Sequence, residues 1–276
     1  MTKNERVQEI ARQLNIIDDT LFQKMAEDPE FCEEMISTVL EQKVIVKEVK
    51  PQNSIKNLQG RSVTLDALCE LESGEDCTVE VQKADDDNHQ KRVRYITSCV
   101  TANITEPGSK FKEVPNVIGI YISKFDMFDS GKTVYHIDRI IRETGEVVEN
   151  GLQEIYVNAK VDDGSDVAEL MHIFTETDAY DFEKFPKVSG RKKQFKQNEG
   201  GQEKMCDLVE NYARECAAEA VQEATKQVTE QAMLDTANNA RRLFENGVVY
   251  DIVRASMPSL SDETLQRIYD EVKKGK

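Results

Sequence analysis

Two carboxylates, Asp66 and Glu80, occupy positions that facing β-strands would bring together. Apolar residues recur at every second position over residues 62–71, and the same alternation returns over residues 77–83. The polar segment 72–76 between them contains glycine, serine and acidic residues and is typical of a turn. The two segments therefore predict a β-hairpin that carries one carboxylate on each strand.

The spacing permits metal chemistry at this hairpin. If the turn is centred near Ser73, Asp66 and Glu80 lie opposite each other, with Cβ atoms about 5 Å apart. Carboxylates this close repel each other unless a cation or a proton lies between them. Mg²⁺ binds a few carboxylate oxygens, and it would polarise a phosphodiester oxygen and help to deprotonate a bound water. Spacing alone also fits two solvent-facing residues of an amphipathic hairpin.

Helices and further strands are expected around the hairpin. Helical spacing of apolar residues predicts helices over residues 4–14, 28–40, 89–104 and 165–175, and Asp18 or Asp19 is expected to cap a further helix that contains Leu21, Phe22 and Met25. Apolar and β-branched runs predict strands over residues 44–49, 117–122, 134–141 and 152–157. Pro51 is expected to end the first of these strands.

The C-terminal part is expected to be helical. Residues 203–246 contain no proline or glycine, and many of their inner positions are alanine. Such a stripe buries little area, so this helix would either pack on the core or pair with another chain. Ser261 is expected to cap the last helix. The final helical hairpin fits a helix-turn-helix unit or a plain packing unit.

Charge limits the partners that the chain can bind. The net charge of −16 argues against a general affinity for nucleic acid, so DNA contacts must come from local basic patches. Two such patches exist, and the second equally fits a solvated face: Lys83, Lys91, Arg92 and Arg94 form the first, and Lys184, Lys187, Arg191, Lys192, Lys193 and Lys196 form the second.

Composition also bears on compartment and metal type. No run of about 18 apolar residues is present, so no membrane span is expected, and the N-terminus has no apolar signal region. We therefore expect a cytoplasmic protein. The six cysteines form no CxxC pair and only three histidines are present, which argues against a zinc site. Cys69 and Cys77 could face each other across the hairpin and are expected to be reduced, small buried residues.

The hairpin sequence GRSVTLDALCELESGEDCTVEVQKA, at residues 60–84, resembles the PD-(D/E)XK nuclease family transposases, also called recombination-promoting nucleases. That family carries a strand ending in Asp, a short acidic turn and a strand reading Glu-x-Gln. In this chain these are Asp66 and Glu80-Val81-Gln82. The resemblance covers most of the chain in the same order, through residues 18–40, 91–100, 116–128 and 150–160.

The resemblance implies a set of site residues. Asp66 and Glu80 would be metal ligands, and the backbone carbonyl of Val81 would add a third oxygen. Gln82 holds the position at which most PD-(D/E)XK enzymes place a lysine that stabilises the transition state. The catalytic candidates are therefore Asp66, Glu80 and Gln82, with Mg²⁺ as the cofactor and Mn²⁺ as its substitute.

Two further groups come from the resemblance. Asp19 matches an early acidic position and would complete the outer shell of the metal, or it would be a helix N-cap. Gln23 stands where the family motif usually has lysine. In the helix after the hairpin, Tyr95 is expected to pack in the core. The DNA-contact candidates on that helix are Lys91, Arg92 and Arg94.

The implied fold is α/β, with a restriction-endonuclease-like core, a mixed central sheet flanked by helices, and a C-terminal helical extension. Residues 1–180 would form the core, 181–202 a polar, basic connector, and 203–276 the helical tail. The implied function is a metal-dependent DNA endonuclease of the transposase or recombination-promoting type. The alternatives are an inactive nuclease fold that binds through its tail, and an assembly protein that forms a homo-oligomer through the C-terminal helices.

Overall fold

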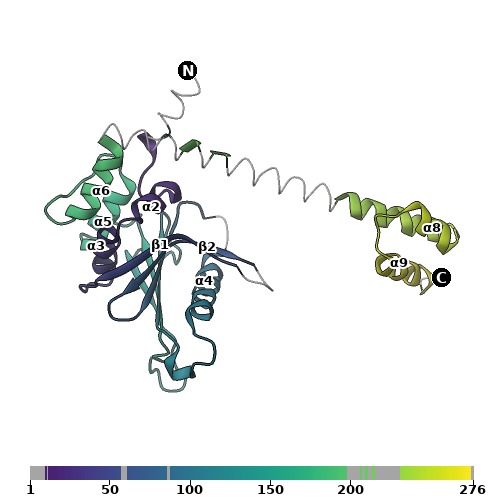
Figure 1. Ribbon diagram of the computed structural model, residues 1–276, viewed down its shortest axis with the longest axis horizontal. Helices are drawn as coiled ribbons and strands as arrows, with labels where there is room; N and C mark the ends of the chain where they lie inside the picture. The colour runs from purple at the N-terminus through teal and green to yellow at the C-terminus, as the bar shows by residue number, and fades with distance from the viewer. Residues whose placement is uncertain are drawn as a thin grey trace. The chain divides into compact units, whose positions relative to one another are not determined.

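A computed structural model of the chain describes residues 12–56, 61–85, 88–197 and 231–274, together with residues 10, 206, 209, 210, 213 and 214. The chain divides into two compact units, Met1–Glu210 and Asn211–Lys276. The first unit contains a six-stranded mixed sheet flanked by helices (Figure 1). The expected α/β fold class is thus confirmed.

The sheet has the strand order β1-β2-β3-β4-β6-β5. Its strands are β1 (Val46–Ile55), β2 (Val63–Leu71), β3 (Asp76–Gln82), β4 (Val117–Ser123), β5 (Val134–Ile137) and β6 (Leu152–Asn158). The strands β3, β4 and β6 run parallel, and β1, β2 and β5 pair antiparallel to their neighbours. The predicted hairpin is confirmed, with Cys69 directly opposite Cys77.

One prediction for the sheet is wrong. Strand β1 does not end before Pro51 but continues through it to Ile55, with Pro51 opposite Ala67 in the antiparallel ladder. The physical reason is that β1 lies at the edge of the sheet, where a residue without an N–H costs no hydrogen bond to a second neighbour. Strand β5 is shorter than predicted, since it ends at Ile137 and an isolated bridge between Ile140 and Val147 follows.

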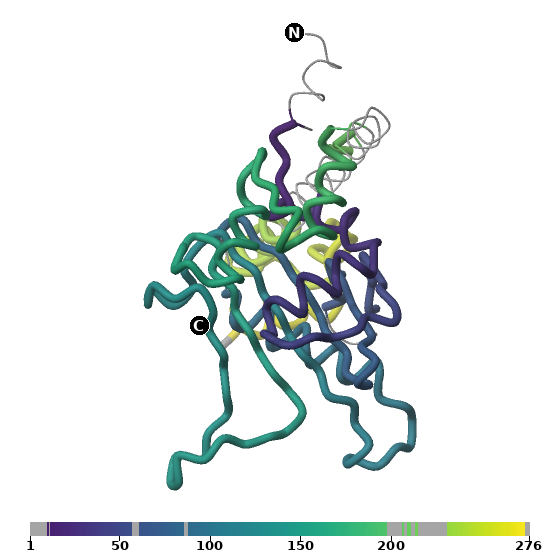
Figure 2. Tube along the Cα trace, turned by 90° about the vertical axis from the view of Figure 1, so that its left-hand side faces the viewer, coloured from purple at the N-terminus to yellow at the C-terminus, as the bar shows by residue number. Residues whose placement is uncertain are grey.

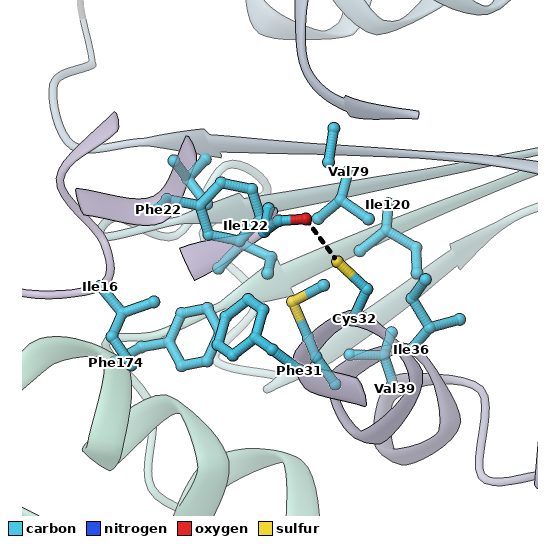
Figure 3. Close-up of a cluster of buried hydrophobic side chains, with 14 of the residues drawn as sticks. Ile16, Phe22, Phe31, Cys32, Ile36, Val39, Val79, Ile120, Ile122 and Phe174 are labelled. Carbon is cyan, nitrogen blue, oxygen red and sulfur yellow. Dashed lines mark hydrogen bonds between the residues drawn. The ribbon is translucent and has the colours of Figure 1, made fainter. Parts of the chain in front are cut away.

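Helices cover both faces of the sheet. On one face, α2 (Asp19–Met25), α3 (Pro29–Val39), α5 (Asp166–Thr175) and α6 (Pro186–Gln197) share a core cluster with residues of β2, β3 and β4. The rings of Phe22, Phe31 and Phe174 lie 6.1–6.4 Å apart at its centre (Figure 3). Helix α4 (His89–Ile104) packs on the other face.

Two loops project from the end of the sheet that lies away from α2 (Figure 2). One contains the short 3₁₀ helix η1 (Phe111–Glu113) and leads into β4, and the other joins β5 to β6. Because β3, β4 and β6 are parallel, the entry points of β4 and β6 lie at this end and the C-terminal end of β3 lies at the opposite end.

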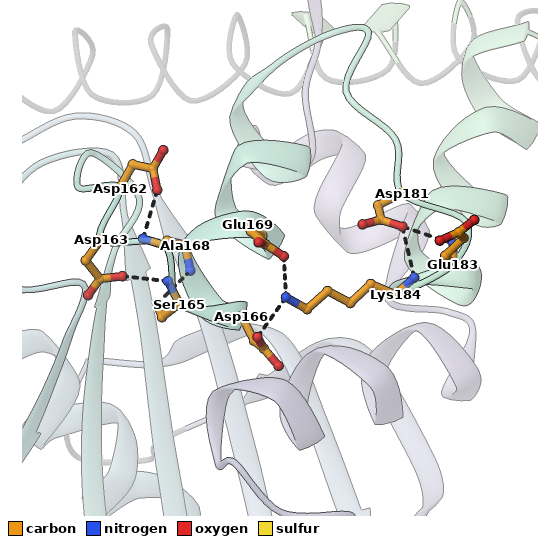
Figure 4. A network of polar contacts seen from close by, with 10 residues as sticks. Asp162, Asp163, Ser165, Asp166, Ala168, Glu169, Asp181, Glu183 and Lys184 are labelled. Carbon is orange, nitrogen blue, oxygen red and sulfur yellow. Dashed lines mark hydrogen bonds and ion pairs between the residues drawn. The ribbon is translucent and has the colours of Figure 1, made fainter.

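The second basic patch largely holds α6 against the rest of the first unit. Lys184 bridges Asp166 and Glu169 of α5 (Figure 4). Lys187 pairs with Glu30 over 2.7 Å. Helix α6 falls within the range predicted as a connector, and its Val188 and Phe195 belong to the core cluster. Most of this patch is therefore engaged within the protein.

Lys192 is the buried member of that patch. Its Nζ donates hydrogen bonds to the carbonyls of Ile173 over 2.8 Å, of Ala179 over 3.1 Å, and of Glu176. These carbonyls lie at and just beyond the C-terminus of α5, where backbone acceptors lack helical partners. Burial lowers the pKa of Lys192 to about 8.

The second unit is a small helical bundle. Its described part contains helical residues 231–245, α8 (Tyr250–Ser256) and α9 (Asp262–Lys274). The rings of Phe244, Tyr250 and Tyr269 lie 5.0–6.0 Å apart in its core. Ser261 Oγ accepts from Thr264 N, so the predicted cap is confirmed. Most of the predicted helix 4–14 and much of 203–246 lie outside the described residues; within the first range, residues 10, 12 and 13 are helical. In the part of the chain that the structure describes, no helix could cross a membrane.

Candidate functional site

Asp66 and Glu80 meet where β2 and β3 stop pairing through their main chains. The last registered pair of this ladder is Ala67 and Val79, and the two carboxylates follow it directly. Asp66 N–H donates to Glu80 Oε1 over 3.3 Å, and Val81 N–H donates to Asp66 Oδ2 over 2.9 Å. Each carboxylate thus binds a main-chain group of the other strand, which fixes both side chains.

Both carboxylates are buried, with only 6% of Asp66 and 2% of Glu80 exposed. Burial raises the pKa of Asp66, against the opposing effect of the hydrogen bonds from Val81 and Gln23. Burial also raises the pKa of Glu80 well above its usual value, and the nearby charge of Asp66 adds to this rise. The two buried acids repel each other and therefore lower the stability of the folded protein unless a proton or a cation lies with them.

One oxygen of Glu80 forms no hydrogen bond with the residues that the structure describes. Among the described residues, no group donates to the buried atom Glu80 Oε2. Arg92 Nη2 lies 3.7 Å from it, which is an ion-pair distance and too long for a hydrogen bond. A buried acceptor of this kind normally has a partner, so the orphaned oxygen fits a metal ligand.

Arg92 links Glu80 to Gln82. Its Nη1 donates to Gln82 Oε1 over 3.2 Å, while Gln82 Nε2 donates to the carbonyl of Ala84 over 3.0 Å. The sequence interpretation made Arg92 a DNA-contact candidate and left Gln82 in the position of the missing lysine. In the structure a guanidinium lies beside that position, and it comes from α4 rather than from β3.

Gln23 is a site residue whose contact the sequence did not predict. Its Nε2 donates to Asp66 Oδ1 over 3.1 Å, and its Oε1 accepts from Gln52 over 2.5 Å. Helix α2 and strand β1 thus both support the carboxylate on β2. The available signal was the position of Gln23 in the family motif, where lysine is usual, but one sequence does not show that this residue reaches Asp66.

Asp19 lies at the rim of this site. The N-cap of α2 is Asp18, so Asp19 is the first residue inside the helix and not its cap. Burial raises the pKa of Asp19 to about 6, and the charge of Asp66 contributes to the rise. Lys83 points elsewhere, since its Nζ pairs with Asp18 Oδ1 over 2.6 Å.

Helix α4 brings Arg92 to the site. Asn88 caps the helix by accepting from Lys91 N over 3.0 Å. Gly119 of β4 lets the helix approach closely, because a Cβ at this glycine would lie 2.8 Å from Thr97 Cγ2. At the start of the helix, Nδ1 of the buried His89 lies 2.8 Å from Tyr121 Oη.

A hollow of about 580 Å³ opens beside Arg92. Cationic, polar and apolar side chains all line it: Arg61, Ser62, Val63, Thr64, Asn88, Lys91, Arg92, Tyr95 and Ile96. Lys91 and Arg92, two of the predicted DNA contacts, therefore share one cavity, whereas Arg94 is exposed and outside it. Tyr95 is half-buried, and its hydroxyl donates to the carbonyl of Arg61 over 2.5 Å.

The donor set suits a hard divalent cation. Among the described residues, no group of three or more His, Cys, Asp or Glu side chains could hold a metal ion, so a metal here would depend on Asp66 and Glu80. Mg²⁺ is commonly bound by one or two carboxylates, with waters and substrate oxygens filling the other positions. Val81 lies at the site through its N–H, and its carbonyl remains a predicted ligand.

A family model for PD-(D/E)XK nuclease family transposases matches residues 20–239, which include every described strand and both carboxylates, Asp66 and Glu80. The chain belongs to this family. Membership in the PD-(D/E)XK transposase family gives the protein a nuclease-type function and implies a DNA substrate. PD-(D/E)XK nucleases are generally dependent on divalent metal ions, in keeping with the paired carboxylates. No curated protein and no solved structure matches the chain.

Proposed function

We propose that this protein is a Mg²⁺-dependent DNA endonuclease that hydrolyses phosphodiester bonds, as a transposase or recombination-promoting nuclease does. The observation that carries the proposal is the buried oxygen Glu80 Oε2, which accepts no hydrogen bond from any described residue and lies beside the second buried acid, Asp66. Asp66 and Glu80 would hold the ion, with the Val81 carbonyl as a third ligand and Asp19 in the outer shell. When bound, Mg²⁺ polarises a phosphate oxygen and lowers the pKa of a bound water.

The chain's own residues prepare the site for a phosphate. Val81 N–H and Gln23 fix the two oxygens of Asp66, so its lone pairs have defined directions. Arg92 supplies a cation 3.7 Å from Glu80, which suits it to stabilise charge on a phosphate in the transition state. Gln82 orients Arg92 by accepting its hydrogen bond. We propose that Arg92 takes over the role usually given to lysine at position 82.

A plasmid-nicking assay with Mg²⁺ or Mn²⁺ tests this function. We expect nicking by the wild-type protein, and its loss in Asp66→Ala and Glu80→Ala. Asp76→Asn is a matched control, because Asp76 is an acid at the opposite end of β3. Equal nicking by all four proteins would assign the activity to a contaminant. Metal binding without nicking would favour the alternative of an inactive nuclease fold that acts through its helical tail.

We also propose that the C-terminal helices mediate homo-oligomer formation. More than half of each of four apolar side chains in the second unit is exposed: Met233, Leu234, Val249 and Ile252. Exposed apolar groups of this size are typical of interaction surfaces when they lie together. Sedimentation of the full chain and of a chain ending at about residue 200 tests the proposal. An unchanged oligomeric state after truncation would contradict it.

A further inference from the structure

The hollow beside Arg92 contains cations for which the described part of the chain supplies no carboxylate partner. Among the described residues, no carboxylate pairs with Arg61 or Lys91, although the chain carries a net charge of −16. The second basic patch differs, because Lys184 and Lys187 pair with acids. Clustered cations that remain unpaired in an acidic protein point to an anionic ligand.

The position of the hollow adds a second favourable charge. The N-terminus of α4 lies at its wall, since both the N-cap Asn88 and the first-turn residue Lys91 line it. The N-terminal end of a helix carries a partial positive charge and favours phosphate groups. Arg61 reaches the same cavity from the residues that precede β2, so the cations approach from two segments far apart in the sequence.

The rest of the lining suits a base and a sugar. Val63, Tyr95 and Ile96 supply apolar surface, and Ser62 and Thr64 supply hydroxyl groups. The hydrogen bond from Tyr95 to the Arg61 carbonyl holds the aromatic ring in place. A volume of about 580 Å³ is in the range of pockets that hold one small molecule, which suits a single nucleotide.

We propose that this hollow holds one unpaired nucleotide of the DNA strand, next to the phosphate at Asp66 and Glu80. The inference deepens the proposed nuclease function and rests on it. Arg92 lines the hollow, and its Nη2 also lies 3.7 Å from Glu80 Oε2, so the hollow and the carboxylate site share this residue. A strand that enters both must be locally unpaired, because base and phosphate would separate from the complementary strand. The preferred substrate is therefore DNA with a single-stranded stretch or end.

Fluorescence anisotropy with the full-length protein tests the hollow without divalent cations, so that binding is measured apart from cleavage. The probes are a labelled oligothymidylate and a blunt duplex of equal length. We expect tighter binding of the single strand, and a Kd about tenfold higher in Arg61→Ala and in Lys91→Ala. Lys112→Ala is the matched control, because Lys112 is an exposed cation of η1, which lies outside the hollow and before the entry to β4. Its Kd should stay within about twofold of the wild-type value.

Three outcomes would overturn the subsite. These are equal losses in Lys91→Ala and Lys112→Ala, duplex binding as tight as single-strand binding, and wild-type affinity in both hollow variants. Failure of the proposed function is a separate result. If the hollow variants lose single-strand binding as expected but the wild-type protein cleaves no DNA with Mg²⁺ or Mn²⁺, the subsite stands and the nuclease assignment fails.

Discussion

Val81 N–H donates a hydrogen bond of 2.9 Å to Asp66 Oδ2, so the main chain of β3 fixes a carboxylate that β2 carries. The direction of this side chain therefore depends on the sheet and not on a bound ion. An asparagine at the same position would retain an oxygen for Val81 N–H and would remove the charge, but it would place an NH₂ group where Asp66 Oδ1 accepts from Gln23. Because the main-chain contact is kept while the ligand charge is lost, Asp66 is a sharp position for testing metal binding.

Asp66→Asn is expected to weaken Mn²⁺ binding more than tenfold and to raise the melting temperature at neutral pH without divalent ions. The first effect follows from the loss of a ligand charge, and the second from the removal of a buried acid that repels Glu80. Isothermal titration calorimetry and thermal unfolding measure them. Unchanged Mn²⁺ affinity would contradict the assignment of Asp66 as a ligand.

The stability of the metal-free protein should depend on Asp19 in a defined pH interval. Because folding raises the pKa of Asp19 to about 6, the folded state binds more protons than the unfolded state from about pH 4 to about pH 6. The contribution of Asp19 to the free energy of unfolding therefore falls as the pH rises through this interval. Urea unfolding at several pH values measures this contribution as the difference in the free energy of unfolding between the wild-type protein and Asp19→Asn. A difference that does not vary with pH would contradict the raised pKa.

Gly119→Ala should destabilise the protein by about 1–3 kcal/mol, since the new Cβ would lie 2.8 Å from Thr97 Cγ2 and push α4 from the sheet. Nicking should fall as well, because α4 carries Arg92. Gly190→Ala is the control in urea unfolding. Gly190 lies in α6 with nothing within 4 Å of an added Cβ, so alanine should stabilise by about 0.5–1 kcal/mol. Equal effects of the two substitutions would rule out the close helix–strand contact.

Lys192→Met should cost about 2–3 kcal/mol in the free energy of unfolding, because three backbone carbonyls lose a charged donor. Lys193→Met removes the same charge from the neighbouring exposed position and should cost less than about 0.5 kcal/mol. Chemical denaturation of both variants gives the comparison. Similar losses would mean that the charge of α6, and not the buried contacts of Lys192, sets its stability.

Arg92→Gln should lower the nicking rate by about a hundredfold if Arg92 supplies the cation of the site. Gln82→Lys alone should not raise the rate, because it replaces the acceptor of Arg92 with a second cation. In the Arg92→Gln background the same lysine should restore part of the activity. Nicking time courses give the rates. A Gln82→Lys single variant that nicks faster than wild type would show that Arg92 does not supply the cation in place of lysine.

The hairpin and its carboxylates could be predicted because the relevant signals are local. Alternation on both sides of an acidic turn sets the register, and that register places Asp66 beside Glu80. The caps of later helices, such as Ser261, are equally local signals. The family resemblance then carried these local features across most of the chain.

The remaining site contacts join residues that sequence spacing does not connect. Gln23 reaches Asp66 across 43 positions, and Arg92 meets Glu80 only because α4 lies close on β4 through Gly119. The prediction that Pro51 ends β1 is wrong for a related reason, since the effect of a proline depends on whether its strand is central or at an edge. That placement follows from the pairing of the whole sheet and cannot be derived from the strand itself.

Pro51 also has a consequence for how molecules of this protein meet at high concentration. An edge strand offers free N–H and C=O groups along one side, and a strand from a neighbouring molecule can pair with them. Proline in β1 offers no N–H at its position, and proline on an edge strand discourages pairing with another chain. We therefore expect Pro51, which does not stop the strand, to disfavour aggregation through this edge.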